Sequence, residues 1–253
     1  MRIHSTALSF IWKLAIMLLG GSAIALRLGA LTGSLDVVPF HYFSLLIAIA
    51  AVIYWLCDGI CLLVKRNDPE SSGVLEPSLK YAITMCSGIV LAATHFILRI
   101  GPFYGDGWDY AFVVLHYALP LMMVLDWLLF DRKGLMHAYG PAIWTFPILL
   151  YLLVTELLVC GLGLDLGGDF AISGVGRYPY PFLDASAKNP LHVAYLIGMG
   201  YLFFTALGYI VFAVDRLLSR VGRDAREAQA AAEKQAESDI QPPLSAGPRH
   251  FRS

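Results

Sequence analysis

Six long apolar stretches constrain the fold of this chain more than any other feature of the sequence. They span residues 10–31, 40–64, 79–100, 110–130, 141–162 and 191–214. Each has the roughly 20 residues that a helix rising about 1.5 Å per residue needs to cross a bilayer. Turn-forming residues such as Thr32-Gly33-Ser34 separate the stretches. The sequence therefore predicts an all-α, polytopic membrane protein with six transmembrane helices.

The composition excludes an ordinary soluble domain. Hydrophobic residues make up 58% of the 253 positions and charged residues only 15%, and the mean hydropathy is +0.65. A soluble protein of this length needs more polar surface than that. The four cysteines lie inside the apolar stretches, which argues against a disulfide framework. The first stretch has no small-residue cleavage site, so we interpret it as a retained helix rather than a signal peptide.

Basic residues in the loops and near the ends of the apolar stretches predict the orientation. They gather at the N-terminus, in the second and fourth loops and after the sixth helix: Arg2, Lys13, Lys65, Arg66, Lys80, Arg132, Lys133, Arg216, Arg220, Arg223 and Arg226. Under the positive-inside rule both termini are then cytoplasmic. The tail, residues 215–253, is expected to continue the sixth helix into water over residues 221–238 and to be disordered beyond Ile240, where prolines recur.

Several polar side chains recur at one depth in the outer half of the predicted bundle. An ionisable group at the bilayer centre costs about 2.5–3.5 kcal/mol, so each one calls for a reason. Four helices contribute polar groups about 6–9 Å below their outer ends, namely Ser44, His95, His116 and Glu156. His41 shares a helix face with Ser44, and Arg99 shares one with His95, because residues three or four apart are neighbours. The common depth predicts a shared cavity, although each residue taken alone is more often a hydrogen-bonding partner between helices.

Two aspartates lie in the cytoplasmic half of the predicted bundle. Asp58 is about 40° round an ideal helix from Ser44, so it is a candidate for the floor of the same cavity. Asp126 lies near the end of the fourth stretch. The interpretation favoured for both is structural, as hydrogen-bond acceptors between helices.

Two strings of residues resemble a known family. One runs from His116-Tyr117-Ala118-Leu119-Pro120 to Asp126-Trp127-Leu128-Leu129-Phe130, and the other is Tyr178-Pro179-Tyr180-Pro181-Phe182-Leu183-Asp184. Together they resemble bacterial six-helix homologues of the androgen-induced membrane hydrolases, over about residues 40–215. Characterised animal members of that family hydrolyse fatty acid esters of hydroxy fatty acids, using an intramembrane threonine and a histidine.

The resemblance implies a site and a setting for this chain. His116 matches the family's histidine a few residues before a proline, and Ser44 stands where the family has its threonine. Leu45-Leu46 replaces the polar pair that often follows. Ser44 would be the nucleophile and His116 its base, with His41, His95, Arg99 and Glu156 in support and no cofactor or metal. The implied partners are membrane lipids and a fatty-acid ester, and the implied location is a bacterial inner membrane.

Two alternatives stay open. In the first, His41, His95 and His116 bind zinc beside a carboxylate in a metal-dependent lipid hydrolase, although no HExxH-type spacing supports this. In the second, the chain is a transporter or scaffold without enzymatic activity, although no inverted repeat is visible. No nucleic-acid partner is expected, and the sequence does not set the oligomeric state.

Overall fold

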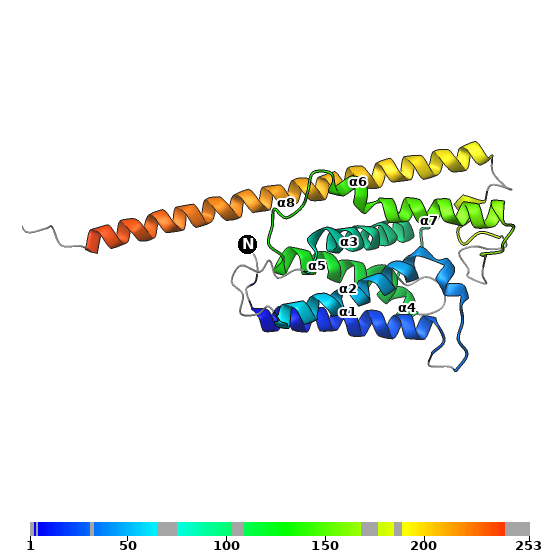
Figure 1. The fold of residues 1–253 in the computed structure, drawn as a ribbon, viewed down its shortest axis with the longest axis horizontal. Coiled ribbons are helices and arrows are strands. Elements are labelled where there is room, and N and C mark those ends of the chain that lie inside the picture. Colours follow the sequence, from blue (N-terminus) through cyan, green and yellow to red (C-terminus); the bar gives the residue numbers. More distant parts are fainter. Residues whose placement is uncertain are drawn as a thin grey trace, which may run out of the picture.

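The structure, a computed structural model, describes residues 3, 5–30, 33–64, 75–102, 109–167, 177–184 and 189–240. Within these residues the regular structure is entirely helical. The helices are α1 (Thr6–Arg27), α2 (Phe43–Val64), α3 (Pro77–Ala92), α4 (Tyr110–Val113), α5 (Leu119–Phe130), α6 (Gly140–Trp144), α7 (Phe146–Glu156) and α8 (Pro190–Ile240). Figure 1 shows that they run roughly side by side along the long axis of the molecule.

Six helical spans in the described residues are long and apolar enough to cross a membrane. They are Thr6–Arg27, Phe43–Val64, Pro77–Ile97, Tyr110–Phe130, Gly140–Gly161 and Pro190–Ala232. The prediction of an all-α, six-helix membrane protein is thereby confirmed. Which membrane holds the protein, and which side its termini face, stay predictions.

Three of the spans contain a π-helical segment at corresponding ends. These segments are Ala93–Ile97 after α3, Val114–Ala118 between α4 and α5, and Leu157–Gly161 after α7. A π-helical turn inserts one extra residue into a helix and recurs at functional sites. Each segment shifts the direction in which neighbouring side chains point, relative to a regular helix.

Local capping explains where several helices begin. The Ser5 side chain accepts a hydrogen bond from the Leu8 N–H at the start of α1, and Asp109 does the same for Phe112 at the start of α4. Such caps satisfy N–H groups that have no carbonyl four residues earlier. A 3₁₀ turn, Val38–His41, precedes α2 and carries Pro39. Because the chain is extended at Tyr42, α2 begins only at Phe43.

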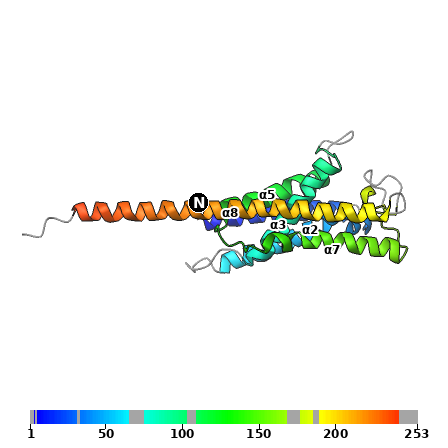
Figure 2. The ribbon, with the colours of Figure 1, turned by 90° about the horizontal axis from the view of Figure 1, so that it is seen from above.

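The core of the bundle lies between α1, α2, α3 and α5. Ile16, Leu45, Trp55, Leu119 and Met123 are buried there in one cluster. α8 lies along the edge of the bundle against α6 and α7, and the two views show it extending far beyond the other helices (Figures 1 and 2). The N-terminus lies at the end of the bundle from which α8 projects (Figure 1). The predicted disorder beyond residue 240 falls outside the described residues.

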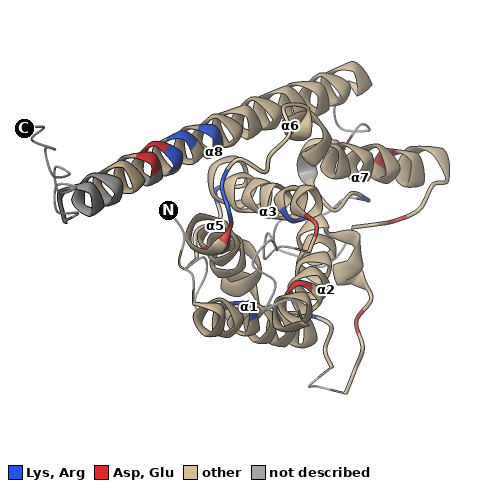
Figure 3. Ribbon diagram, turned by 60° about the vertical axis from the view of Figure 1, so that its left-hand side comes forward, with Lys and Arg blue, Asp and Glu red and all other residues tan. Residues whose placement is uncertain are grey.

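Two lysines that were predicted to lie among the charges outside the helices lie inside helices instead. Lys13 belongs to α1 and Lys80 to α3, and their side chains are 1% and 0% exposed. Each is held by buried aspartates, which lets a lysine remain charged in apolar surroundings. The prediction that Lys13 and Lys80 lie among the charges outside the helices was therefore wrong. Elsewhere in the bundle charged residues are sparse, and they recur along the projecting part of α8 (Figure 3).

Candidate functional site

Ser44 lies in the first turn of α2. It is the second residue of that helix, and its side chain is buried. The N–H groups of Leu45 and Leu46 bond to the Tyr42 carbonyl, so those of Phe43 and Ser44 stand at the helix terminus. The first N–H groups of a helix have no intrahelical acceptor and carry its partial positive charge. The Ser44 hydroxyl therefore sits where the helix favours negative charge.

His116 lies in the π-helical segment Val114–Ala118. Pro120 follows four residues later and has no N–H to bond the carbonyl of His116, which explains the irregular turn at this point. The imidazole Nδ1 lies 3.0 Å from the Phe112 carbonyl, and the two rings stack with centroids 4.4 Å apart. Because a carbonyl only accepts, Nδ1 carries the hydrogen, and Nε2 is left as the basic nitrogen.

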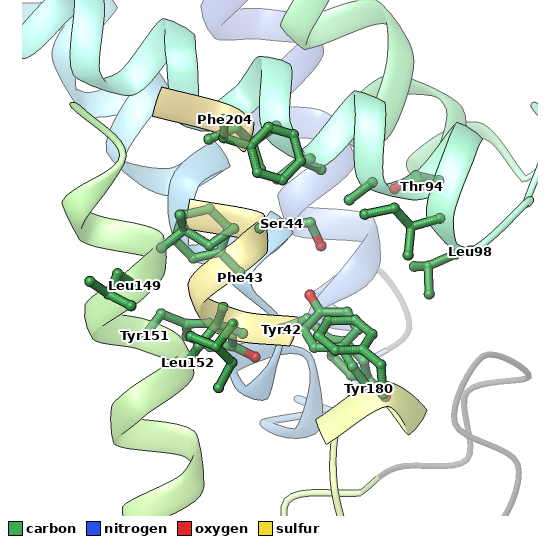
Figure 4. A pocket seen from close by; sticks show the side chains of 18 of the residues that line it. Tyr42, Phe43, Ser44, Thr94, Leu98, Leu149, Tyr151, Leu152, Tyr180 and Phe204 are labelled. Carbon is green, nitrogen blue, oxygen red and sulfur yellow. The ribbon is translucent and has the colours of Figure 1, made fainter. Parts of the chain in front are cut away.

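Ser44 and His116 line one cavity of about 210 Å³. The other lining residues are mostly apolar. They come from α2 and the residue before it, from α3 and the π-helical segment after it, from α7 and α8, and from the segment before α8; they include Tyr42, Phe43, Ile89, Thr94, Leu98, Leu149, Tyr151, Leu152, Tyr180 and Phe204. In Figure 4 the Ser44 side chain lies in the middle of this lining, between Phe204 on one side and Tyr42 and Tyr180 on the other. Among the described residues no hydrogen bond joins Ser44 to His116, and unliganded sites commonly tighten only when substrate binds.

His95 and Arg99 lie outside this cavity. His95 is exposed, and its Nδ1 lies 3.3 Å from the Tyr117 hydroxyl, which itself donates to the Ile100 carbonyl. Arg99 is exposed too and has a φ of 55°, a left-handed conformation typical of a helix C-terminus. The structure therefore does not bring either residue into the cavity of Ser44 and His116, where the resemblance implied a supporting role.

His41 and Glu156 also have partners of their own. His41 donates from Nδ1 to the Leu166 carbonyl over 3.1 Å. Glu156 accepts a hydrogen bond from the Tyr178 hydroxyl over 3.3 Å and is approached by the Cys160 thiol. Neither residue lines the cavity, and within the described residues the His116 ring is oriented by the Phe112 carbonyl and by stacking on the Phe112 ring.

The zinc alternative finds no ligand set in the described part of the chain. No three His, Cys, Asp or Glu side chains there lie close enough together to hold a metal ion. His41, His95 and His116 instead bond to Leu166, Tyr117 and Phe112 respectively.

Aromatic residues that were not predicted as site residues form one wall of the cavity. Tyr180 meets Tyr42 edge to face, with ring centroids 5.9 Å apart, and Tyr151 lies at 6.3 Å. The Tyr151 hydroxyl donates to the His41 carbonyl over 2.6 Å, which ties α7 to the turn before α2. Burial raises the pKa of Tyr180, so its phenol stays protonated. The string Tyr178 to Asp184, noted for its family resemblance, was the one signal pointing here.

A network of buried charges lies at the other end of the bundle. The Lys13 ammonium lies 2.6 Å from Asp58 Oδ2 and 3.3 Å from Asp126 Oδ2. Lys80 binds Asp126 and Asp131 at 2.5 and 2.6 Å. Asp58 is therefore part of this network and does not floor the cavity. It lies 14 residues beyond Ser44, about 21 Å along α2.

Known proteins offer no guide to this site. No family model matches the chain, and no curated protein or solved structure matches it. The candidate site rests on its own geometry, and the resemblance to the androgen-induced hydrolases stays a prediction.

Proposed function

We propose that this integral membrane protein hydrolyses fatty-acid esters within the membrane, with Ser44 as the nucleophile and His116 as the general base. The observation that carries the proposal is that Ser44 and His116, on separate spans, line one apolar cavity. The family resemblance of the His116-to-Pro120 string favours the same chemistry.

The proposed reaction begins with proton transfer from serine to histidine. A serine hydroxyl is a weak nucleophile until a neighbouring base takes its proton. Nε2 of His116 accepts the Ser44 proton while Nδ1–H stays bonded to Phe112. The serine oxygen attacks the ester carbonyl, and the imidazolium then returns the proton to the departing alcohol oxygen. Water, deprotonated by the same nitrogen, releases the fatty acid and restores Ser44.

The surroundings of Ser44 suit the charge that develops during this reaction. The tetrahedral intermediate carries a negative oxygen next to the start of α2, whose terminal N–H groups and helix dipole stabilise it. The cavity is lined mainly by aliphatic and aromatic side chains. An apolar lining binds an acyl chain and excludes bulk water, which strengthens each electrostatic contact at the ester.

Hydrolysis of a fluorogenic fatty-acyl ester by the purified protein in nanodiscs tests the proposal. Ser44→Ala and His116→Gln are expected to lower kcat/KM by about 10²-fold or more, the range for loss of a general base or nucleophile. Ser44→Thr keeps a hydroxyl and is expected to keep measurable activity. Ser87→Ala is the matched control, because Ser87 is a buried serine of α3 that does not line the cavity.

Two outcomes would overturn the proposal. Activity unchanged in both Ser44→Ala and His116→Gln would remove these residues from the chemistry. Absence of ester hydrolysis in the wild-type protein, together with solute flux into liposomes, would favour the transporter alternative.

A further inference from the structure

A second cavity, of about 270 Å³, lies between α3, α5, α6 and α8. It shares only Ile89 and Phe204 with the cavity that holds Ser44 and His116, so it is a separate chamber on the far side of these two residues. Trp127 of α5 and Trp144 of α6 form part of its lining, and α3 and α8 contribute most of the other lining residues.

The lining of this second cavity favours a lipid over water. It is almost wholly apolar, and a water molecule needs two or more polar partners to be held in a buried site. An empty space of this size would leave the side chains around it without dispersion contacts. Because the spans around it cross a membrane, acyl chains are the ligands that surround this part of the molecule.

Two hydroxyl groups of the lining residues favour a lipid that has an oxygen acceptor. Tyr81 Oη and Thr84 Oγ1 are both buried, and neither has a hydrogen-bond partner among the described residues. They are three residues apart on α3, so they share one face of that helix. A buried hydroxyl without a partner is destabilising, and an oxygen acceptor on a ligand would remove that penalty.

The charges near these hydroxyls favour a neutral head group. The carboxylates of Asp131 and Asp215 both act electrostatically on Tyr81, against the single ammonium of Lys80. Lys80 is itself already paired with Asp131 and Asp126. A fatty-acid carboxylate placed beside Tyr81 would be repelled by the carboxylates of Asp131 and Asp215, whereas an uncharged hydroxyl would not.

The shape of the second cavity suits a single extended chain. Its lining on α3 runs from Tyr81 to Ala92, which corresponds to about 16 Å along the helix axis. Tyr81 and Thr84 lie at one end of this lining, and most of the other lining residues are apolar. This suits one extended chain with its polar group at Tyr81 and Thr84.

We propose that this cavity binds a single-chain neutral amphiphile, a long-chain fatty alcohol, with its oxygen at Tyr81 and Thr84 and its chain along α3 toward Ile89. The inference does not depend on the proposed hydrolase reaction, because none of the three residues takes part in it.

Photolabelling in nanodiscs tests the site. The probe is a long-chain alcohol carrying a diazirine and an alkyne, and the labelled peptides are identified by mass spectrometry. Labelling is expected on α3 and α8 peptides that border the cavity. An excess of unlabelled alcohol is expected to reduce it at least tenfold, while a fatty acid of the same length is expected to compete at least tenfold less well.

Two glycines provide a matched pair of blocking variants. A Cβ added at Gly88, in the second cavity, or at Gly200, in the first, meets no atom within 4 Å. Gly88→Leu is therefore expected to fill the second cavity and to reduce labelling there at least tenfold while leaving ester hydrolysis unchanged. Gly200→Leu is expected to leave this labelling unchanged, and its effect on hydrolysis reports on the first cavity alone.

The role of the Tyr81 and Thr84 hydroxyls is tested separately. Tyr81→Phe together with Thr84→Val keeps the shape of the cavity and is expected to abolish the preference for alcohol over acid. Equal labelling in the wild-type protein and Gly88→Leu would overturn the proposal, as would a fatty acid that competes as well as the alcohol. Should Gly88→Leu fail to fold, the comparison of alcohol and acid in the wild-type protein decides.

Discussion

The Lys80 ammonium lies 2.5 Å from Asp126 Oδ2, and both side chains are fully buried. Asp126 also accepts from Trp55 Nε1 over 3.1 Å and contacts Lys13, so one carboxylate connects α1, α2, α3 and α5. Charges that are kept from water need such partners. The network holds four helices together at one end of the bundle, whereas Ser44 and His116 lie at the other.

Replacing Lys80 is expected to destabilise the protein strongly. Lys80→Met leaves Asp126 and Asp131 buried with less compensating charge, which typically costs about 3–5 kcal/mol. Thermal unfolding in detergent measures the effect. Arg223→Met is the control, because Arg223 lies on the projecting part of α8 with its side chain 68% exposed, and it is expected to change little. A Lys80→Met protein as stable as the wild type would contradict this account of the network.

Lys80 and Asp126 are expected to be coupled energetically. Asp126→Leu alone leaves Lys80 and Lys13 without one of their carboxylates. In the double variant Lys80→Met, Asp126→Leu both charges are gone, so the loss of stability is expected to fall short of the sum of the single losses by about 0.5–3 kcal/mol. A complete double-mutant cycle measures this difference. Strictly additive losses would show that the two residues act independently.

Pro120 is expected to matter for activity more than for stability. Pro120→Ala supplies the missing N–H, so the π-helical segment can become regular helix and turn the His116 ring away from the cavity. We expect ester hydrolysis to fall at least tenfold while the melting temperature is maintained. Pro77→Ala serves as control, because Pro77 is the first residue of α3, where no intrahelical hydrogen bond is missing. Equal activity in the two variants would show that the π-helical segment Val114–Ala118 is not needed for ester hydrolysis.

Filling the first cavity is expected to shorten the acyl chains that the protein accepts. Gly200→Leu places a side chain in that cavity and should lower kcat/KM at least tenfold more for long-chain than for short-chain esters. Gly198→Leu, two residues away on α8, adds the same side chain outside the cavity, where its Cβ also meets nothing. The ratio of rates on the two esters is the measurement. The same ratio in both variants would argue against chain binding in this cavity.

The fold was predictable because it depends on the length of apolar stretches. A helix needs about 20 apolar residues to span a bilayer whatever it packs against, and the six stretches meet this requirement one by one. The depth of a residue can be counted in the same way, which is why Ser44 and His116 were placed at one level. The first residue of α2 was predicted three positions early because the extended conformation at Tyr42 depends on local backbone geometry.

What the sequence did not predict depends on contacts between helices. Depth does not determine which way a side chain faces, so His95 and Glu156 share the level of Ser44 but lie outside its cavity. The partners of Lys13 and Lys80 are also distant in sequence: Lys13 pairs with Asp58, and Lys80 with Asp126. Nothing in the sequence links these residues, so basic residues close to helix ends were counted as loop charges.

Covalent labelling of Ser44 tests the central claim most directly. A fluorophosphonate reacts only with a hydroxyl that a neighbouring base has activated, and peptide mapping identifies the modified residue. We expect the adduct on Ser44 in the wild-type protein, at least tenfold slower labelling in His116→Gln, and none in Ser44→Ala. An adduct on another residue, or labelling that persists in Ser44→Ala, would contradict the assignment of this cavity as a hydrolase site.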